Sequence, residues 1–307
     1  MMQIFITGGT GLIGRELVNR WLEQEYQVTL LTRSPEKALS YFQDHAAFCH
    51  VSAVHSLQVF TNFNQFDAVI NLAGEPIFDH RWTAQQKVRL WQSRINLTEK
   101  LTALINTSEN PPQCFISGSA YGYYADNGDQ IITEAQSAGQ NFTAQLCQQW
   151  ELVAKQANTR VCLSRTGMVF SPKGGALAKI LPLYRYRLGG KLGNGLQFMP
   201  WIALEDMLNA IDFLLHTPSC QGAFNLCSPN PVRNKDFNRL LAKQLHRPAF
   251  MNVPTFLLKL ILGERACLIL DSQNLYPQKL LEQGFSFQYS ELADYLRSTF
   301  GKSAINV

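Results

Sequence analysis

Short apolar runs alternate along this chain with longer stretches in which apolar residues recur every three or four positions. The runs lie at 4–7, 28–31, around 48–51, 68–74, 114–117, 161–164 and 223–226. Helical spacing follows the first run and is clearest over Thr83–Asn106 and Phe142–Ala157. Buried strands that alternate with amphipathic helices are typical of a parallel sheet covered on both faces. The pattern therefore predicts the α/β class, with a doubly wound parallel sheet.

The pattern changes at Ser171, where glycines and prolines crowd a stretch that has little periodicity. Apolar spacing later predicts helices around 237–245, 254–262 and 292–300, but few strands. We expect residues 1–170 to form a nucleotide-binding domain, completed by a later helix and strand at about 204–228. Segments 171–203 and 229–307 should supply substrate-side loops and a smaller, mostly helical C-terminal lobe. The cleft between lobe and sheet is the expected site.

A glycine-rich turn follows the first apolar run directly. Its residues are Gly8, Gly9, Thr10, Gly11, Leu12, Ile13 and Gly14. Without Cβ atoms at Gly8 and Gly11, the backbone can approach a pyrophosphate closely, and Gly14 lets the next helix lie close to the sheet. That helix points its N-terminal N–H groups at the phosphates. The turn predicts a dinucleotide site; a βαβ turn that binds nothing is the alternative.

Composition narrows the choice of partner. The 307 residues are 46% hydrophobic and 16% charged, with a net charge of +4 and no run of five like charges. Binding to nucleic acid or to a membrane has no support in this composition, so we expect a small-molecule partner. The start of the chain has no leader segment, which favours a cytoplasmic protein.

Cysteine and histidine spacing predicts neither disulfides nor a metal site. The seven cysteines are spread along the chain without a CxxC pair and should be reduced core residues, and the six histidines have no ligand spacing. The apolar stretch from Thr255 to Leu270 is interrupted by charges such as Lys259. We predict that it forms a buried helix and not a membrane span.

Four motifs follow one another along the chain: Thr7–Gly14, Asn71–Gly74, Ser117–Ala120 and Arg165–Gly167. In this order and spacing they resemble the extended short-chain dehydrogenase/reductases, the NAD(P)-dependent epimerase/dehydratase superfamily, over residues 1 to about 230. Further features are similar to the YfcH-like epimerase branch, which carries its own small C-terminal domain. These are Gly122–Tyr124, Trp150–Glu151, the glycines from Gly189 to Gly195, and Pro277–Phe287. The resemblance implies a Rossmann domain that binds a nicotinamide dinucleotide.

Arg33 indicates which nicotinamide cofactor the chain prefers. An acidic residue at the end of the second strand would bind the ribose 2′-hydroxyl of NAD, whereas a guanidinium matches the 2′-phosphate of NADP. The sequence has Leu31-Thr32-Arg33 at this place. We therefore predict NADP as the cofactor; a solvent-facing arginine is the alternative.

The resemblance also implies roles for residues after the later strands. Leu72, Ala73 and Gly74 should pass beside the ribose and the pyrophosphate, with Glu75 near a ribose hydroxyl. Arg81 would contact a phosphate or cap the next helix. Val169 would cover the nicotinamide or belong to the core.

The proton-transfer residues of ordinary family members are incomplete in this chain. Such members use a Ser or Thr after the fifth strand and a Tyr-x-x-x-Lys pair on the next helix, where the lysine lowers the pKa of the tyrosine. Ser119 stands at the serine position, but Thr143 and Cys147 stand where the tyrosine and lysine belong. A threonine hydroxyl is too weak an acid, and a neutral thiol carries no positive charge.

Two interpretations of this absence remain. Either Tyr123 or Tyr124, the phenols nearest to Ser119 in sequence, takes over the acid/base role, or the fold binds NADP without fast chemistry. Tyrosines at a glycine-rich turn also serve as packing anchors. Glu134 is a further acid near this loop, although most such residues are solvated.

The substrate side is indicated by Gln197 and Trp201, where an amide and an aromatic ring would suit a sugar or a flat carbonyl compound. Trp201 as a core residue is the alternative. A small basic cluster of Arg185, Arg187 and Lys191 would hold a phosphate or carboxylate, or lie on a solvated loop.

The sequence as a whole predicts an NADP(H)-dependent oxidoreductase or epimerase for a small carbonyl or sugar-type substrate. A non-catalytic NADP(H)-binding sensor or scaffold is the alternative. Relatives often form homodimers through the helices expected at Thr83–Asn106 and Phe142–Ala157, so a homodimer is a further expectation.

Overall fold

A seven-stranded parallel sheet forms the centre of the protein, and its strand order is β12-β7-β5-β4-β1-β2-β3. The structure is a computed structural model, and it describes residues 1–301. The strands of the sheet are β1 (Gln3–Thr7), β2 (Gln27–Leu31), β3 (Val51–Val54), β4 (Ala68–Asn71), β5 (Cys114–Ala120), β7 (Arg160–Thr166) and β12 (Gly222–Leu226). The predicted doubly wound class is confirmed, because every neighbouring pair in this sheet is parallel.

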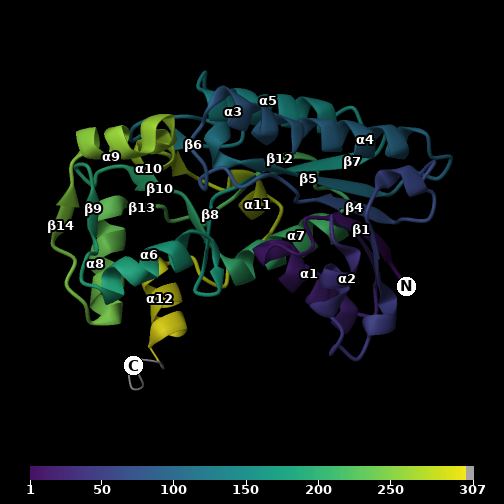
Figure 1. Ribbon diagram of the computed structural model, residues 1–307, viewed down its shortest axis with the longest axis horizontal. Coiled ribbons are helices and arrows are strands. Elements are labelled where there is room, and N and C mark those ends of the chain that lie inside the picture. The colour runs from purple at the N-terminus through teal and green to yellow at the C-terminus, as the bar shows by residue number, and fades with distance from the viewer. Residues whose placement is uncertain (302–307) are drawn as a thin grey trace.

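Helices cover both faces of the sheet (Figure 1). One face carries α1 (Leu12–Glu23) and α7 (Leu204–His216), and α2 (Pro35–Ser40) lies beside β2 and β3. The other face carries α3 (Ala84–Gln92), α4 (Ile95–Asn106) and α5 (Phe142–Ala154). All four residues of β4 are buried because the strand lies between these two layers. Its near-continuous apolar sequence is typical of such a position.

The chain changes direction within the sheet between β1 and β4. From β1 it proceeds outward to β2 and β3, and then returns to add β4 on the other side of β1. Thr7 therefore pairs in register with Leu31 of β2 and with Asn71 of β4. At such a switch point the connections diverge and leave a crevice at the carboxyl ends of the strands.

The helix expected over Thr83–Asn106 is two helices, so this prediction is corrected. Helix α3 ends at Gln92, and α4 begins at Ile95. Ser93 lies between them, where its hydroxyl accepts a hydrogen bond from the backbone N–H of Glu75 and donates one to the carbonyl of Leu90. The bond from Glu75, in the chain after β4, and the bond to Leu90 hold Ser93 at the break. Apolar periodicity alone does not reveal this break.

The third strand, predicted around 48–51, lies at Val51–Val54 in the structure. Residues Phe48–His50 form a 3-10 turn, and the strand begins at Val51, which pairs with Val28 of β2. The turn is closed by local backbone bonds such as Phe48 N–H to the carbonyl of His45. Phe48 therefore packs against the main core without being part of a strand.

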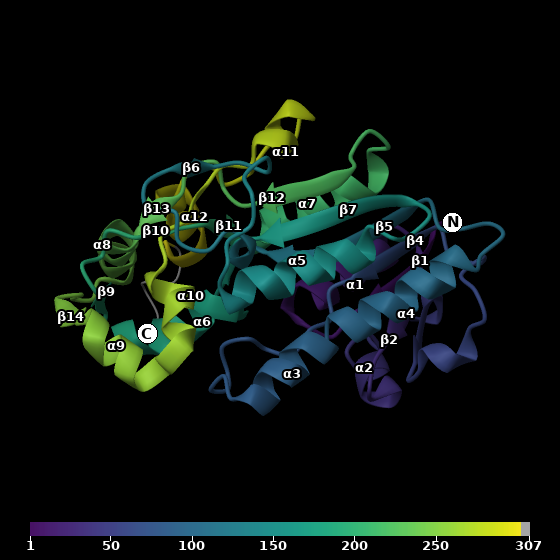
Figure 2. The same cartoon turned by 90° about the horizontal axis from the view of Figure 1, so that it is seen from above.

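A smaller lobe extends from the carboxyl end of the sheet (Figure 2). Its helices are α6 (Gly175–Arg185), α8 (Asn234–Leu245), α9 (Thr255–Leu262), α10 (Cys267–Leu270) and α12 (Leu292–Phe300), whereas α11 (Gln278–Glu282) packs beside β12 of the sheet. Two-residue to four-residue strands pair across the chain: β8 (Met168–Ser171) with β11 (Trp201–Ala203), β9 (Gly190–Leu192) with β14 (Met251–Val253), β10 (Phe198–Met199) with β13 (Val232–Arg233), and β6 (Ile131–Ile132) with β15 (Asn274–Leu275). The lobe is thus built from segments on both sides of α7 and β12.

Helix α9 is not the buried helix that the sequence predicted. Leu258 is its one buried residue, whereas Phe256 and Leu260 are more than 70% exposed. The helix lies at the outer edge of the lobe, where only one side meets other elements (Figure 2). Within residues 1–301, no helix is long and apolar enough to cross a membrane.

All seven cysteines are free thiols, and five of them are buried as the sequence predicted. The other two are not fully buried core residues. Cys49 is exposed because it lies in the 3-10 turn before β3, and Cys267 is half-buried. The part of the chain that the structure describes contains no group of three metal-ligating side chains.

Candidate active site

A cleft of about 960 Å³ opens at the carboxyl ends of β1, β2 and β4, at the switch point of the sheet. The glycine turn, the ends of β2 and β4, a short segment after β3 and one side of α4 enclose it. Its lining includes Thr7, Gly8, Thr10, Gly11, Thr32, Arg33, Ser56, Leu72, Ala73, Gly74, Glu75, Ser93, Asn96 and Lys100. The structure thus brings together most of the residues that the sequence placed beside a cofactor.

The glycine turn has a different steric demand at each glycine. Gly8 has φ +74°, and a Cβ there would lie 2.8 Å from the backbone carbon of Leu72. A Cβ at Gly14 would lie 2.3 Å from the carbonyl oxygen of Gly8, so α1 packs directly on the turn. A Cβ at Gly11 meets only that same oxygen at 3.3 Å and otherwise faces open space. Gly8 and Gly14 therefore maintain the turn, and Gly11 leaves room for a ligand.

Helix α1 presents unpaired backbone donors to the cleft. Its N-cap is Gly11, which has no side chain to accept a hydrogen bond from the first turn. The predicted residues Leu12 and Ile13 lie in this first turn, and the side chain of Leu12 packs near Gly174 at the start of α6. The N–H groups of a helix N-terminus attract anionic oxygens, which suits a pyrophosphate.

A hydrogen-bond network fixes the two strand ends below the turn. The hydroxyl of Thr7 donates to Oδ1 of Asn71 at 2.7 Å, and the amide of Asn71 donates to the hydroxyl of Thr98 at 2.9 Å. The N–H of Ala73 donates to Thr7 Oγ1 at 3.2 Å. All three side chains of the network are buried, so the segment Leu72–Gly74 has a fixed path along the cleft.

Arg33 is exposed and lines the cleft two residues after β2. No acidic side chain within residues 1–301 forms an ion pair with it. Arg81 lies elsewhere: its guanidinium is near Gly263 at the end of α9, and it does not line the cleft. Val169 packs in β8 against the main core, in register with Ile202.

The three predicted catalytic residues surround one buried ion pair, and each is engaged differently. Ser119 is buried, and its hydroxyl donates to Glu151 Oε1 at 2.7 Å. Arg165 binds both oxygens of that carboxylate at 2.8 Å and also donates to the hydroxyl of Tyr124 at 2.8 Å. The Tyr124 hydroxyl in turn donates to Asn225 Oδ1 at 2.7 Å.

The environments of the two tyrosines differ. Burial raises the pKa of Tyr124, although Arg165 acts in the opposite direction. Tyr123 is half-buried, and the guanidinium carbon of Arg165 lies 3.5 Å from the centre of its ring. Among residues 1–301 the Tyr123 hydroxyl has no hydrogen-bond partner, whereas that of Tyr124 has two.

Thr143 and Cys147 lie on α5 beside this network. The Thr143 hydroxyl donates to Asn141 at the start of the helix. Burial, followed by the nearby Glu151 carboxylate, raises the pKa of the Cys147 thiol to about 11, so the thiol is neutral at pH 7. Neither residue supplies an ionised group of its own.

The side chains of Gln197 and Trp201, which were predicted on the substrate side, are buried and form hydrogen bonds within the protein. Gln197 donates its side-chain amide to the carbonyls of Leu192 and Ile269. Trp201 is fully buried, and its indole N–H donates to the carbonyl of Asn230. Glu134 accepts hydrogen bonds from the backbone N–H groups of Asn225 and Lys279. In this conformation all three side chains connect separate chain segments.

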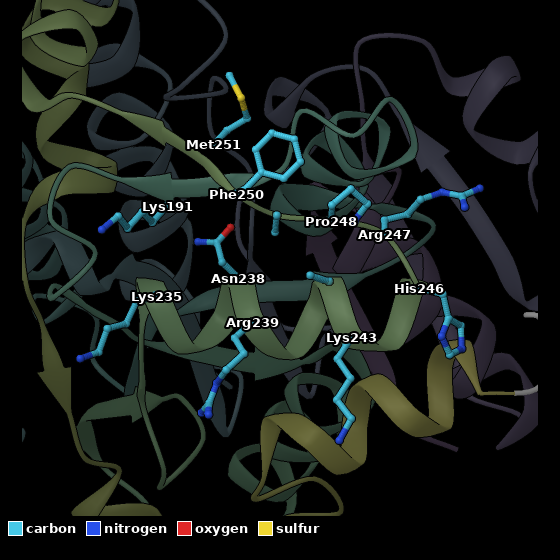
Figure 3. A pocket seen from close by; sticks show the side chains of 12 residues that line it. Lys191, Lys235, Asn238, Arg239, Lys243, His246, Arg247, Pro248, Phe250 and Met251 are labelled. Atoms are coloured by element: carbon cyan, nitrogen blue, oxygen red, sulfur yellow. The ribbon is translucent and has the colours of Figure 1, made fainter.

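The three residues of the predicted basic cluster do not line one common site. Arg185 and Arg187 are exposed after α6, while Lys191 lines a second groove of about 730 Å³ between α8 and β14. In Figure 3, Lys235, Arg239 and Lys243 project from one side of α8, and Phe250 lies on the other. This groove shares no lining residue with the cleft at the sheet.

Several residues of the cleft were missed by the sequence prediction. Gln92, Asn96 and Lys100 line it from α3 and α4, and Arg94 lies behind Gly74. The i, i+4 spacing of Asn96 and Lys100 on α4 was a signal that these two polar side chains share one side of the helix. Arg94 gave no such signal, because its place is set by the break between the two helices.

Comparison with known proteins gives a consistent result. The family described as NAD dependent epimerase/dehydratase matches residues 4–227, and a domain family of unknown function, DUF1731, matches residues 253–299. An epimerase family protein SDR39U1 homologue from Arabidopsis thaliana, described as chloroplastic, is 37% identical over 97% of this chain and 86% of its own length. An epimerase family protein of Staphylococcus haemolyticus is 36% identical over 95% of this chain and 97% of its own.

Solved structures show the same fold. Human epimerase family protein SDR39U1 (isoform 2), crystallised with NADPH, has a TM-score of 0.86 and 26% identity, with all of both chains covered. A UDP-glucuronic acid 4-epimerase from Bacillus cereus, in complex with UDP-glucuronic acid and NAD, has a TM-score of 0.77 at 16% identity over 98% of each chain. At that identity the likeness concerns the fold alone.

Proposed function

Because the chain belongs to the NAD dependent epimerase/dehydratase family, we propose that it is an NADP(H)-dependent oxidoreductase or epimerase for a small carbonyl or sugar-type substrate. The single observation that carries the choice of cofactor is Arg33, a cation without an acidic partner among residues 1–301, at the end of β2 in the cleft. A guanidinium there matches a 2′-phosphate. The human relative crystallised with NADPH supports the same choice.

The residues of the cleft fit such a cofactor. Arg33 would hold the 2′-phosphate, the first turn of α1 the pyrophosphate, and Leu72–Gly74 the adjoining riboses. The open space at Gly11 admits the pyrophosphate. When bound, the cofactor supplies a hydride donor or acceptor. The protein's own part is to bind and orient it and to provide a proton at the substrate oxygen.

Among the predicted acid/base residues, Tyr123 is best suited to provide that proton. Ser119 and Tyr124 already donate their hydroxyl protons to Glu151 and Asn225. The hydroxyl of Tyr123 has no partner among residues 1–301, and the Arg165 guanidinium stacks on its ring and holds the ring in place. Ser119 then acts by holding Glu151, and thereby Arg165, in position.

A specific observation favours the second candidate function, a sensor or scaffold that binds NADP(H) without turnover. The network of Ser119, Glu151, Arg165, Tyr124 and Asn225 is closed on itself, and its hydroxyl groups have partners. Such a network stabilises the end of β5 without any substrate.

Calorimetric titration with NADPH and NADH tests the cofactor. We expect NADPH to bind more tightly, and Arg33→Asp to remove that preference because the carboxylate repels the 2′-phosphate. Arg89→Asp, at an exposed arginine of α3 outside the cleft, is the matched control and should keep the preference. An unchanged NADPH/NADH ratio in Arg33→Asp would contradict the assignment.

Turnover separates the two candidate functions. NADPH oxidation should be followed with a panel of aldehydes, ketones and keto-sugars for the parent, Tyr123→Phe and Tyr124→Phe. If Tyr123 is the acid, its replacement should lower turnover by about 10² to 10⁴ with unchanged NADPH affinity. Brisk turnover in Tyr123→Phe would refute the acid assignment, and an inert parent would favour the sensor.

We also propose a cytoplasmic homodimer that forms through α3, α4 and α5. Val88 of α3 and Leu152 of α5 are both more than half exposed on these helices. Static light scattering of the parent and of Leu152→Glu tests this: the variant should be monomeric, and a monomeric parent would contradict the proposal.

A further inference from the structure

Arg94 carries a half-buried positive charge to which the sequence pattern assigns no role. It lies at the break between α3 and α4, behind the segment that follows β4. No carboxylate within residues 1–301 lies at ion-pair distance from it. Buried charges are normally paired, because removing an ion from water is unfavourable. An unpaired one therefore suggests a missing anionic or strongly polar partner.

The hydrogen bonds of Arg94 leave donors free. Its Nη1 donates to the carbonyl of Leu90 at 3.2 Å and to Ser93 Oγ at 3.3 Å, and its Nη2 donates to the carbonyl of Glu75 at 3.0 Å. A guanidinium has five N–H groups. The N–H of Nε and one N–H of Nη2 therefore have no partner among residues 1–301. Nε is not among the buried side-chain atoms that lack a hydrogen bond, so its N–H is accessible.

The guanidinium lies where the cleft meets the acid/base network. A Cβ on Gly74 would be 2.9 Å from its central carbon, so only a glycine backbone separates it from the cleft. On its other side it packs over Trp150, 5.4 Å from the ring centre. Its charge lowers the pKa of the Cys147 thiol, against the larger effect of burial. Arg94 thus connects the floor of the cleft with the position that lacks a lysine.

We propose that Arg94 binds the part of NADP(H) from the diphosphate to the nicotinamide ribose, through its free Nε N–H, and supplies the positive charge that Cys147 cannot. This rests on the proposed function, because it needs NADP(H) in the cleft. The ligand chemistry matches: phosphate and ribose oxygens accept hydrogen bonds, and a charge-assisted bond to a half-buried guanidinium is strong. A glycine at position 74 lets the guanidinium approach this closely, because a Cβ there would lie 2.9 Å from its central carbon and displace it.

The test compares a whole cofactor with one half of it. Calorimetry should measure NADPH and adenosine 2′,5′-bisphosphate, which has the adenine half with its 2′-phosphate but no diphosphate bridge or nicotinamide. For Arg94→Met we expect NADPH affinity to fall about 10- to 100-fold. The affinity for the bisphosphate should stay within twofold. Arg89→Met, on the exposed side of α3, is the control and should change neither.

The outcomes distinguish this inference from the proposed function. If the parent binds neither ligand, the choice of NADP(H) is wrong. If Arg94→Met loses affinity for both ligands equally, Arg94 only supports the fold, and the inference is overturned. It is also overturned if both affinities stay at the parent value.

A second pair of variants covers the case in which Arg94→Met folds poorly, as judged by its melting temperature. Cys147→Lys alone places a second cation beside Arg94 and should lower the melting temperature of the protein without NADPH through repulsion. In the Arg94→Met background, the same Cys147→Lys should instead restore folding and NADPH affinity, because one cation is again present. Equal effects of Cys147→Lys in both backgrounds would contradict the proposed electrostatic role.

Discussion

At the scale of single residues, the buried ion pair of Glu151 and Arg165 holds the neighbouring Ser119 and Tyr124 through hydrogen bonds. Both side chains are at most 4% exposed, with two hydrogen bonds between them. Glu151→Gln keeps the shape but leaves the guanidinium buried without its carboxylate. We expect the free energy of unfolding to fall by ~3 to 5 kcal/mol, measured by urea denaturation.

The matched control for that variant is Asp294→Asn, which breaks the exposed pair with Arg297. Exposed pairs contribute at most about 1 kcal/mol, so this variant should remain close to the parent. If the two variants lose the same amount, the buried pair has no special role.

A pH dependence follows from Asp271, which lies directly after α10. Burial, with Asp126 nearby, raises the pKa of this carboxyl to about 6. Its unfolded pKa is about 3.9, so the folded protein binds more protons between these values, and stability falls as pH rises from about 4 to about 6. Asp271→Asn removes this contribution. Melting temperatures across that range should fall less steeply in the variant than in the parent, and parallel curves would exclude the effect.

At the scale of elements, two glycines of the turn between β1 and α1 affect different properties: one the stability of the fold and the other the binding of the cofactor. Gly14→Ala places a Cβ at 2.3 Å from the Gly8 carbonyl and should displace α1, which lowers the melting temperature. Gly11→Val points into open space, so the protein should fold and lose affinity for both NADPH and NADH. Normal binding by folded Gly11→Val would show that the nucleotide lies elsewhere.

Elements were predictable where local pattern and burial agree. The strands at 4–7 and 68–71 were evident because parallel strands buried on both faces are apolar throughout. The break at Ser93 was not, because it depends on a bond to Glu75, 18 residues away. The partners of Ser119 and Trp201 are likewise 32 and 29 residues distant, so sequence could place these residues near the site but not reveal what occupies them.

At the scale of the whole molecule, the small lobe is held by pairings between distant segments. Strand β14 pairs with β9, and β15 pairs with β6. A chain that ends at residue 247 loses both partners and exposes Gly190–Leu192 and the core around Tyr184. We expect it to aggregate on expression, judged by gel filtration against the full chain. A monodisperse, NADPH-binding truncated protein would show that residues 1–247 suffice.

The pairing of β15 with β6 also sets an order of events on the ribosome. The side chain of Asn274 binds the carbonyl of Asp129 across 145 residues of chain. At about 5 to 20 residues per second, the segment at β6 waits about 7 to 29 s for its partner to be synthesised. During that interval the buried Ile132 and the tyrosines before it have no cover from β15. The loop that carries Tyr123 therefore cannot reach its final position in the nascent protein until β15 has been synthesised.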